Sequence, residues 1–329
     1  MSRRTDLPRR VYEKHGAYYF VTMERKWLRL CSTKDGLPAM YRALADLTER
    51  ERTSNFVPAV IARWIESKRA EWGAKTAVDQ QRIATKMASS FREFQPAQVT
   101  TPVCAEYLKQ FAATPRTYNM HRSILRQVLA FAALEGLREG YNPIDNIQTK
   151  RTPGRRRLVT DDEIELLKVA ALQAARNGQA LVQMIDLALI TGQRISDVIA
   201  WQWDDVHEDG LRVTQGKTKE RLLIEWTRPL RRVVEACAEG REKEGPLLKT
   251  QSGLPYRYAG IRSAWVRACE RAGIEDLNIH DLRGRAGVDK LQRDGLEGAK
   301  DLLGHRSIKM TEHYVDGKSE RRVKSGRRR

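Results

Sequence analysis

The chain has 329 residues, a length typical of two or three domains. Its 60 lysines and arginines outnumber 42 aspartates and glutamates, so the formal charge is +18. Such an excess indicates a polyanionic partner, most often nucleic acid, although basic solvated faces also occur. No apolar run reaches about 18 residues, and no apolar segment of signal-peptide length follows the charged N-terminus. We therefore expect no membrane partner, no export and a cytoplasmic location.

The cysteines argue against a metal or disulfide framework. They are far apart in the sequence and form no CxxC pair: Cys31, Cys104, Cys237 and Cys269. We expect reduced, mostly packed thiols and no zinc site.

Residues 1–54 are predicted to form a small unit of three strands and one helix. Its short segments VYEKHG, AYYFVT and KWLRLCST are rich in aromatic and β-branched residues and are separated by Gly16 and a polar turn. Asp35–Gly36 indicates another turn, and residues 37–50 read as a helix with Pro38 near its start. A module this small is marginal alone, so neighbours or a bound partner would steady it.

Residues 55–147 are predicted to be an all-α bundle. Apolar residues recur at helical spacing in four segments, 57–72, 77–94, 99–113 and 117–137. In the third, Thr101 is the expected cap and Pro102 the first helical residue. Residues 148–158 are basic and punctuated by proline and glycine, so we expect a linker that lies on a partner rather than in a core.

Residues 159–329 are predicted to be mostly helical with one small hairpin. Thr160 is the expected cap of a first helix with an acidic first turn. A mostly apolar, buried helix then ends at Gly192. The segments LRVTQ and RLLIEWT alternate like strands and are joined through GKTKE. The fold class is therefore mainly α with small β elements, ending in a basic tail.

Four basic stretches of this last region could carry chemistry. They are TGQRISDV with Arg194, GKTKE with Lys217 and Lys219, HDLR with His280 and Arg283, and LLGHRSIKMTEHYV with His305, His313 and Tyr314. Each has an ordinary explanation on its own. Arg194 and Asp197 would form a surface ion pair, lysines on a turn are usually solvated, and a lone tyrosine usually packs in a core.

Together, the order and spacing of these stretches resemble the catalytic region of the tyrosine recombinases, the phage-integrase family. The likeness covers roughly residues 159–315. The preceding regions also resemble the family: an arm-type DNA-binding unit, a helical core-binding domain and a linker. The resemblance implies a site-specific DNA recombinase in a bacterial host, acting in viral genome integration. Its partners would be double-stranded DNA with specific recombination sites, a homotetramer on that DNA, and accessory DNA-bending proteins.

The resemblance also implies a role for each residue. Arg194 and Arg283 would bind the scissile phosphate, and His305 would hydrogen-bond to it. Tyr314 would be the nucleophile that forms a 3′-phosphotyrosine. His280 would accept the tyrosine proton, kept neutral by close cations. Lys217, with Lys219 as the alternative, would protonate the leaving 5′ oxygen.

These residue types suit the chemistry. A phosphodiester gains charge on its equatorial oxygens in the transition state, and arginine offers a planar, permanently charged fork for them. A phosphotyrosine ester keeps the bond energy, so rejoining needs no ATP. The sequence indeed has no GxxxxGK[ST] nucleotide-binding motif and no clustered carboxylates for a two-metal site. We expect no cofactor and no metal, and we interpret His313 as an exposed helix residue rather than a ligand beside His280 and His305.

Two other functions use parts of this pattern. A type IB topoisomerase-like relaxase would need no arm-type unit and no specific site. A DNA-binding regulator would carry a degenerate set, whereas every expected group is present here. The sequence departs from many relatives after HDLR, where GRAGVD replaces bulkier or hydroxyl residues and changes the packing behind His280.

Overall fold

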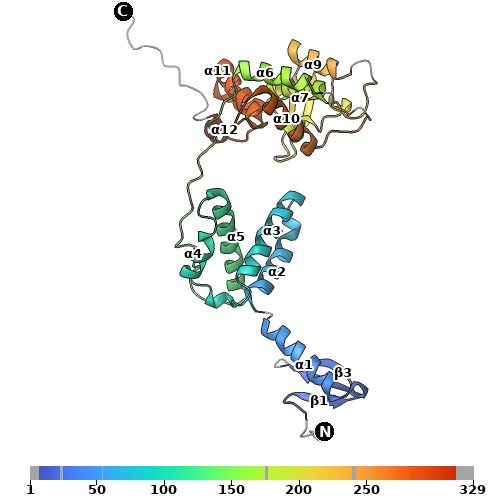
Figure 1. The fold of residues 1–329 in the computed structure, drawn as a ribbon, viewed down its shortest axis with the longest axis vertical. Helices are drawn as coiled ribbons and strands as arrows, with labels where there is room; N and C mark the ends of the chain where they lie inside the picture. Colours follow the sequence, from blue (N-terminus) through green and yellow to red (C-terminus); the bar gives the residue numbers. More distant parts are fainter. Residues whose placement is uncertain are drawn as a thin grey trace, which may run out of the picture. The chain divides into compact units, whose positions relative to one another are not determined.

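The computed structural model describes residues 7–22, 25–53, 55–174, 177–238, 242–250 and 252–315, without the side chains of 49–53 and 313. The chain forms two compact units, residues 1–153 and 154–329 (Figure 1). The boundary between them falls inside the predicted linker, while the division at residue 54 remains a prediction. The first residues of the basic N-terminus and the basic tail after Val315 lie outside the described residues.

A three-stranded antiparallel sheet begins the first unit. Its strands are β1 (Val11–Lys14), β2 (Ala17–Val21) and β3 (Trp27–Ser32), in that order, followed by the 3-10 turn η1 (Thr33–Asp35) and helix α1 (Gly36–Thr53). His15 and Gly16 form the two-residue turn between β1 and β2, with φ of +49° and +71°. Two positive φ values match the right-handed twist of a hairpin, which is why the glycine lies there. The predicted strands and helix are confirmed.

Four helices make up the rest of the first unit. They are α2 (Val57–Lys68), α3 (Ala74–Ser90), α4 (Thr101–Lys109) and α5 (Pro115–Leu134), with the 3-10 turns η2 (Arg69–Glu71) and η3 (Pro96–Gln98) between them. The buried core they share contains Trp64, Met87, Leu108 and Leu125. The predicted cap of α4 was wrong by one residue. Thr100 is the last residue with extended backbone, so it is the N-cap and Pro102 is the second helical residue.

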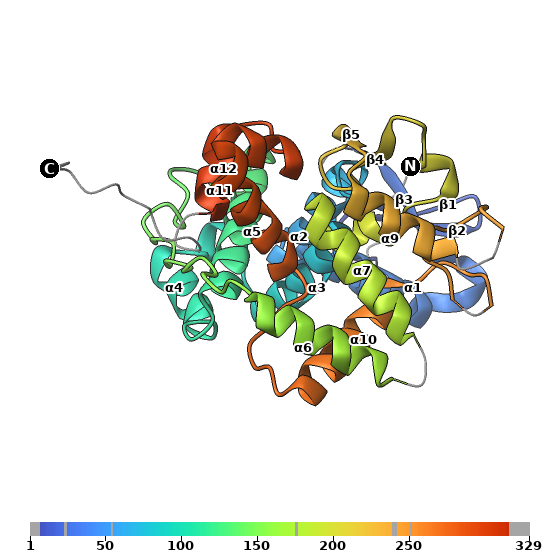
Figure 2. The same cartoon turned by 90° about the horizontal axis from the view of Figure 1, so that it is seen from above.

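The second unit is mainly helical with one hairpin. Its elements are α6 (Asp161–Leu172), α7 (Gly178–Thr191), α8 (Ile195–Val198), the 3-10 turn η4 (Trp203–Asp205), β4 (Gly210–Thr214), β5 (Arg221–Glu225), α9 (Arg228–Ala238), α10 (Tyr258–Ala272), α11 (Asp281–Leu303) and α12 (Ile308–Val315). Helix α7 packs against α6, α9 and α11, and α6 lies beside α10 (Figure 2). The mainly-α fold class with small β elements is confirmed.

Two predicted helix ends are present in this unit. The Thr160 hydroxyl accepts a hydrogen bond from the Glu163 N–H at 3.2 Å, and the Glu163 carboxylate accepts one from the Thr160 N–H at 3.0 Å. This reciprocal cap starts α6. Gly192 ends α7 with a left-handed φ of +63°. The backbone therefore turns sharply at Gly192, immediately before the stretch that carries Arg194.

Two sequence expectations concern the chain as a whole. All four cysteines are free thiols; three are buried and Cys31 is half-buried, as predicted. In the ranges that the structure describes, every helix is too short or too polar to cross a membrane.

His121 of α5 is a buried histidine in the first unit. Its side chain is 4% exposed, its Nδ1 lies 2.6 Å from the Tyr107 hydroxyl, and its ring stacks on Phe111. Burial, with the charges of Lys86 and Arg82, lowers the pKa of His121 to about 4. The folded unit therefore excludes a proton that the unfolded chain binds at mildly acidic pH.

Acidification should destabilise the first unit between pH 6.5 and pH 4. Because the unfolded chain binds the additional proton, the free energy of unfolding falls as the pH drops through this window, by about 3 kcal/mol from His121. Urea unfolding of the full chain across this range measures the loss. His121→Gln, which keeps an acceptor for Tyr107 but cannot titrate, should show a smaller pH dependence. Equal pH dependence in both proteins would contradict the assignment.

Candidate active site

The buried guanidinium of Arg283 lies at the centre of the candidate site. Arg283 is in the first turn of α11 and is 2% exposed. Its Nη1 donates to the Gly192 carbonyl at 2.7 Å and its Nη2 to the Leu303 carbonyl at 2.6 Å. Burial and the nearby charge of Arg194 lower the pKa of Arg283 to about 10. The group therefore stays cationic at neutral pH, and both of these acceptors are neutral.

Gln215, the residue after β4, connects Arg194 to this centre. Its Nε2 donates to Gln193 Oε1 at 2.7 Å and to the Leu303 carbonyl at 3.1 Å. Its Oε1 accepts from Arg194 Nη1 at 2.9 Å and from the Thr218 hydroxyl at 2.6 Å. Both glutamines are fully buried. Sequence reasoning missed them, although Gln193 lies within the stretch TGQRISDV and Gln215 directly precedes GKTKE.

Asp197 is not the surface partner of Arg194 that its spacing suggested. Its side chain is only 4% exposed, and Oδ2 lies 3.8 Å from Arg194 Nη1, beyond hydrogen-bond distance. Oδ1 instead accepts the Gly216 N–H at 2.9 Å. The surface-pair interpretation was wrong because α8 directs this carboxylate inward, where it holds the turn that carries Lys217.

His305 forms one wall of the site and is 8% exposed. Its Nδ1 lies 3.0 Å from the Thr311 hydroxyl and its Nε2 3.4 Å from Arg283 Nη2. Burial and the charges of Arg283 and Arg194 lower the pKa of His305 to about 4. The imidazole is therefore neutral at pH 7. Since arginine can only donate, Nε2 is the acceptor and Nδ1 carries the proton toward Thr311.

Tyr314 of α12 lies between two histidines. Its hydroxyl is 3.1 Å from His280 Nε2, and its ring meets those of His305 and His280 edge-on, with centroids 5.5 and 6.0 Å away. Burial raises the pKa of Tyr314, and the charges of Arg283 and Arg194 oppose that rise. A base must therefore remove the proton before the oxygen can act as a nucleophile, and His280, exposed at the start of α11, is within hydrogen-bond distance.

The structure brings together five of the six predicted site residues. Hydrogen bonds and ring contacts connect these five, in part through Gln215 and the Leu303 carbonyl: Arg194, His280, Arg283, His305 and Tyr314. Lys217 is exposed in the adjoining turn, where the structure shows it no ion pair or hydrogen bond with any described residue, and Lys219 lies two residues on with φ of +58°.

The site offers no evident place for a metal ion. Over the described residues, no three His, Cys, Asp or Glu side chains gather as a metal site would require. The His313 side chain, for which we predicted an exposed position, lies outside the described residues.

The arrangement could bind an anion beside a tyrosine hydroxyl: it has two arginines held by neutral acceptors, a neutral histidine, and a tyrosine whose hydroxyl lies 3.1 Å from a second histidine. Residues 157–321, half of the chain, match the model of the phage integrase family. The chain belongs to the phage integrase family. It is a tyrosine recombinase, an enzyme that cuts and rejoins DNA in site-specific recombination. Family membership therefore favours the recombinase over the two alternatives, a topoisomerase-like relaxase and a DNA-binding regulator.

Two relatives, one of them in two solved structures, extend the likeness over nearly the whole chain. The integrase of Escherichia phage HK022 is 23% identical over 349 residues, which cover 96% of this chain and 95% of that protein. A lambda integrase dimer bound to a COC′ core site has a TM-score of 0.73 at 20% identity, and covers 98% of this chain and 99% of that one. A lambda integrase tetramer bound to a Holliday junction has the same TM-score and coverage at 21% identity. The fold is thus that of lambda integrase.

Gly304, between Leu303 and His305, should tolerate no side chain. Its φ is +61°, and a Cβ would lie 2.6 Å from Gln215 Nε2 and 2.9 Å from Leu222 Cδ1. Gly304→Ala should lower the free energy of unfolding by at least ~1 kcal/mol and slow DNA cleavage, because Gln215 must move. Urea unfolding and cleavage of a nicked substrate measure the two effects.

Gly260→Ala is the matched control for this substitution. Gly260 lies in α10 at ordinary helical φ, and a Cβ there meets nothing within 4 Å. This variant should be as stable as wild type or slightly more so, since alanine favours helix. If Gly304→Ala behaved in the same way, the close approach of Gly304 to Gln215 would not constrain the site.

Proposed function

We propose that Tyr314 is the nucleophile of DNA strand cleavage and that Arg194, Lys217, His280, Arg283 and His305 assist it. The observation that carries the proposal is the position of the Tyr314 hydroxyl, 3.1 Å from His280 and beside the buried cation of Arg283. A tyrosine that only packed would need neither neighbour. Cations close to the phenol lower the cost of forming phenolate and attract the phosphate that it attacks.

The proposed reaction balances without any further reactant. The Tyr314 oxygen attacks the scissile phosphorus while His280 Nε2 accepts the phenol proton, and the P–O5′ bond breaks. Lys217 donates a proton to the leaving 5′ oxygen; the turn held by Asp197 supports this role, and Lys219 is the alternative donor. Arg194 and Arg283 stabilise the added charge on the equatorial oxygens. A 5′ hydroxyl from another strand then attacks the 3′-phosphotyrosine and restores the diester.

His305 would hydrogen-bond to the scissile phosphate. A phosphate oxygen only accepts hydrogen bonds, so His305 Nε2 would have to release Arg283 and take up a proton to become a donor. In the described state, Thr311 and Arg283 hold this ring. Binding of an anion between Arg283 and His305 would favour the protonated imidazole. We propose that His305 changes partner in this way when DNA binds.

The proposed partner is double-stranded DNA carrying specific recombination sites. The net charge of +18 and the lambda integrase complexes with a core site and with a Holliday junction support this proposal. We extend to this chain a homotetramer on DNA, accessory DNA-bending proteins and activity in the bacterial cytoplasm. Residues 1–54 would bind arm-type sites and residues 55–147 core sites, with the catalytic domain 159–329 completing a clamp.

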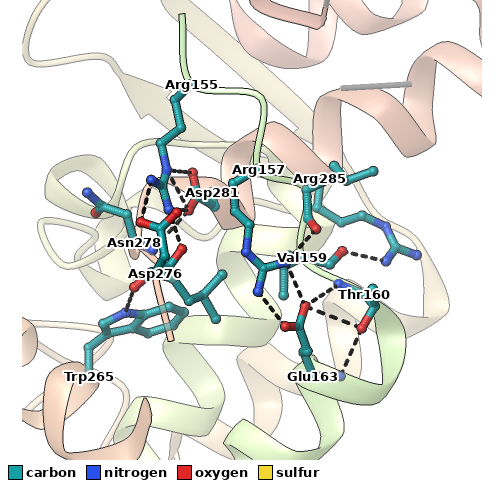
Figure 3. Close-up of polar contacts among 12 residues, drawn as sticks. Arg155, Arg157, Val159, Thr160, Glu163, Trp265, Asp276, Asn278, Asp281 and Arg285 are labelled. Carbon is teal, nitrogen blue, oxygen red and sulfur yellow. Dashed lines mark hydrogen bonds and ion pairs between the residues drawn. The ribbon is translucent and has the colours of Figure 1, made fainter. Parts of the chain in front are cut away.

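The linker arginines divide between two roles. Arg155 and Arg157 pair with carboxylates of the second unit (Figure 3). The expectation that the whole linker 148–158 lies on a partner is therefore too broad. Arg151 and Arg156 are exposed, and neither has an ion pair with any residue that the structure describes, so they are the arginines we assign to the DNA backbone.

Tyr314→Phe should abolish the covalent intermediate. We would incubate the full chain with a suicide DNA substrate, nicked beside the recombination site, and detect a protein–DNA adduct after denaturation. Wild type should form the adduct, and Tyr314→Phe should form none while binding the site normally, because it lacks the attacking oxygen. Tyr258→Phe, a half-exposed tyrosine on α10, is the matched control and should form the adduct. An adduct with Tyr314→Phe would overturn the assignment.

DNA binding should weaken steeply with salt. Neutralising six or more phosphates releases their counterions, so affinity should fall by roughly a thousandfold between 50 and 200 mM salt. Arg156→Gln should reduce the log–log slope by about 1, whereas Arg157→Gln, whose charge is used by Glu163, should leave it unchanged. Fluorescence anisotropy with a labelled site measures the slopes. A flat salt dependence in wild type would rule out the phosphate clamp.

A further inference from the structure

Arg155 comes from the linker but bonds within the second unit. Its Nε donates to the two carboxylate oxygens of Asp281 at 2.9 and 3.0 Å, and its Nη2 donates to Asp281 Oδ2 at 2.7 Å. Its Nη1 donates to Asp276 Oδ1 at 2.8 Å, and Nη2 also reaches the Asp276 carbonyl at 2.5 Å. Figure 3 shows the side chain extending from the linker onto both aspartates. Every nitrogen of this guanidinium thus donates to an acceptor in the turn formed by residues 276–281.

The turn that Arg155 holds leads directly into His280. Asp281 follows His280 in the sequence, is the first residue of α11, and has a side chain only 3% exposed. Its carboxylate also accepts the Asn278 N–H at 2.9 Å, and its own N–H donates to the Asn278 carbonyl. At the other end of the turn, Asp276 has a left-handed φ of +47°. Arg155 therefore bridges both ends of the segment that orients the His280 backbone.

The charge of Asp281 makes this bridge matter for the reaction. A buried carboxylate without a cation is costly, and this one lies beside a site that must receive a phosphate. The Asp281 charge also contributes to the raised pKa of Tyr314. The Arg155 guanidinium compensates that charge through three hydrogen bonds. Without Arg155, the Asp281 carboxylate would have to take up a proton or the turn would have to move toward water, and movement of the turn would displace His280.

We propose that Arg155 is a positioning residue for strand cleavage, which holds His280 opposite Tyr314 through its bridge to Asp276 and Asp281. The inference rests on the proposed roles of His280 and Tyr314. It assigns Arg155 to a different task from that of Arg156, the next residue in the linker. Because Arg155 belongs to the segment that joins the two units, the path of the linker is coupled to the assembly of the site.

Arg157 offers a matched control in the same linker. It carries the same charge two residues away and pairs with Glu163 at the start of α6, not with the turn before His280 (Figure 3). Replacing either arginine by glutamine removes one positive charge from the same short segment. Only Arg155→Gln leaves Asp281 without its cation.

The experiment measures adduct formation by the full chain with the suicide substrate at saturating DNA, together with Kd and Tm. Arg155→Gln should cleave roughly tenfold to a hundredfold more slowly than wild type, as expected for a displaced reacting group. Arg157→Gln should cleave at close to the wild-type rate. Arg155→Lys, which keeps the charge but not the fork, should recover part of the rate. Arg155→Gln combined with Asp281→Asn should also recover part, because the unpaired carboxylate is gone.

Three results would overturn the proposal. If Arg155→Gln weakened only Kd and cleaved at the wild-type rate when saturated, Arg155 would be a DNA contact. If Arg155→Gln and Arg157→Gln slowed cleavage equally, the effect would belong to linker charge in general. If Asp281→Asn restored nothing, the bridge would not act through Asp281. The Tm identifies a variant that fails to fold. If Arg155→Gln does so, the cleavage rate of Arg155→Lys, which keeps the charge but not the fork, tests the proposal instead. Failure of the proposed function itself would appear separately, as absence of adduct with wild type.

Discussion

The second unit is organised around one buried cation whose acceptors are peptide carbonyls. Burying a guanidinium is unfavourable unless its N–H groups are satisfied, so the Gly192 and Leu303 carbonyls must stay in place around Arg283. One carbonyl belongs to the residue that ends α7 and the other to the last residue of α11. The interaction that keeps Arg283 buried thus fixes the two segments from which Arg194 and His305 follow. The same two hydrogen bonds of Arg283 therefore hold a positive charge in the site and fix the backbone around it.

The choice of acceptor separates arginines of the site from arginines of the scaffold. Arg283 is held by carbonyls and Arg194 by the amide of Gln215, so the positive charge of each remains available to an anion. Arg155, Arg157 and Arg285 are held by carboxylates, which neutralise them. Asp197 is a partial exception: its carboxylate accepts the Gly216 N–H and also forms a long ion pair with Arg194, at 3.8 Å. Within this unit, the arginines that stabilise the fold are thus paired with carboxylates, whereas the arginines that could bind an anion are held mainly by neutral acceptors.

The sequence predicted best those features that depend on local chemistry. The cap at Thr160 and the end of α7 at Gly192 depend on neighbouring residues. The candidate site residues were found from the order and spacing of the four basic stretches. The buried glutamines were missed because a polar residue in a core has no periodic signal and is explained only by its partners. The pairing of Arg155 with Asp276 was missed for a similar reason, as 121 residues separate them. A surface pair was predicted for Asp197 because three-residue spacing says nothing of burial.

The same long-range pairing changes what the basic composition means. A count of charges treats all arginines of the linker 148–158 as available to DNA, yet two of them pair with carboxylates of the second unit. One bridge, at Arg157, stabilises the start of α6, and the other, at Arg155, neutralises the carboxylate next to His280. Both therefore connect the end of the linker to elements that carry or support the site. From residue 155 onward the linker is therefore bonded to the second unit, through Arg155 to the turn before His280 and through Arg157 to the start of α6.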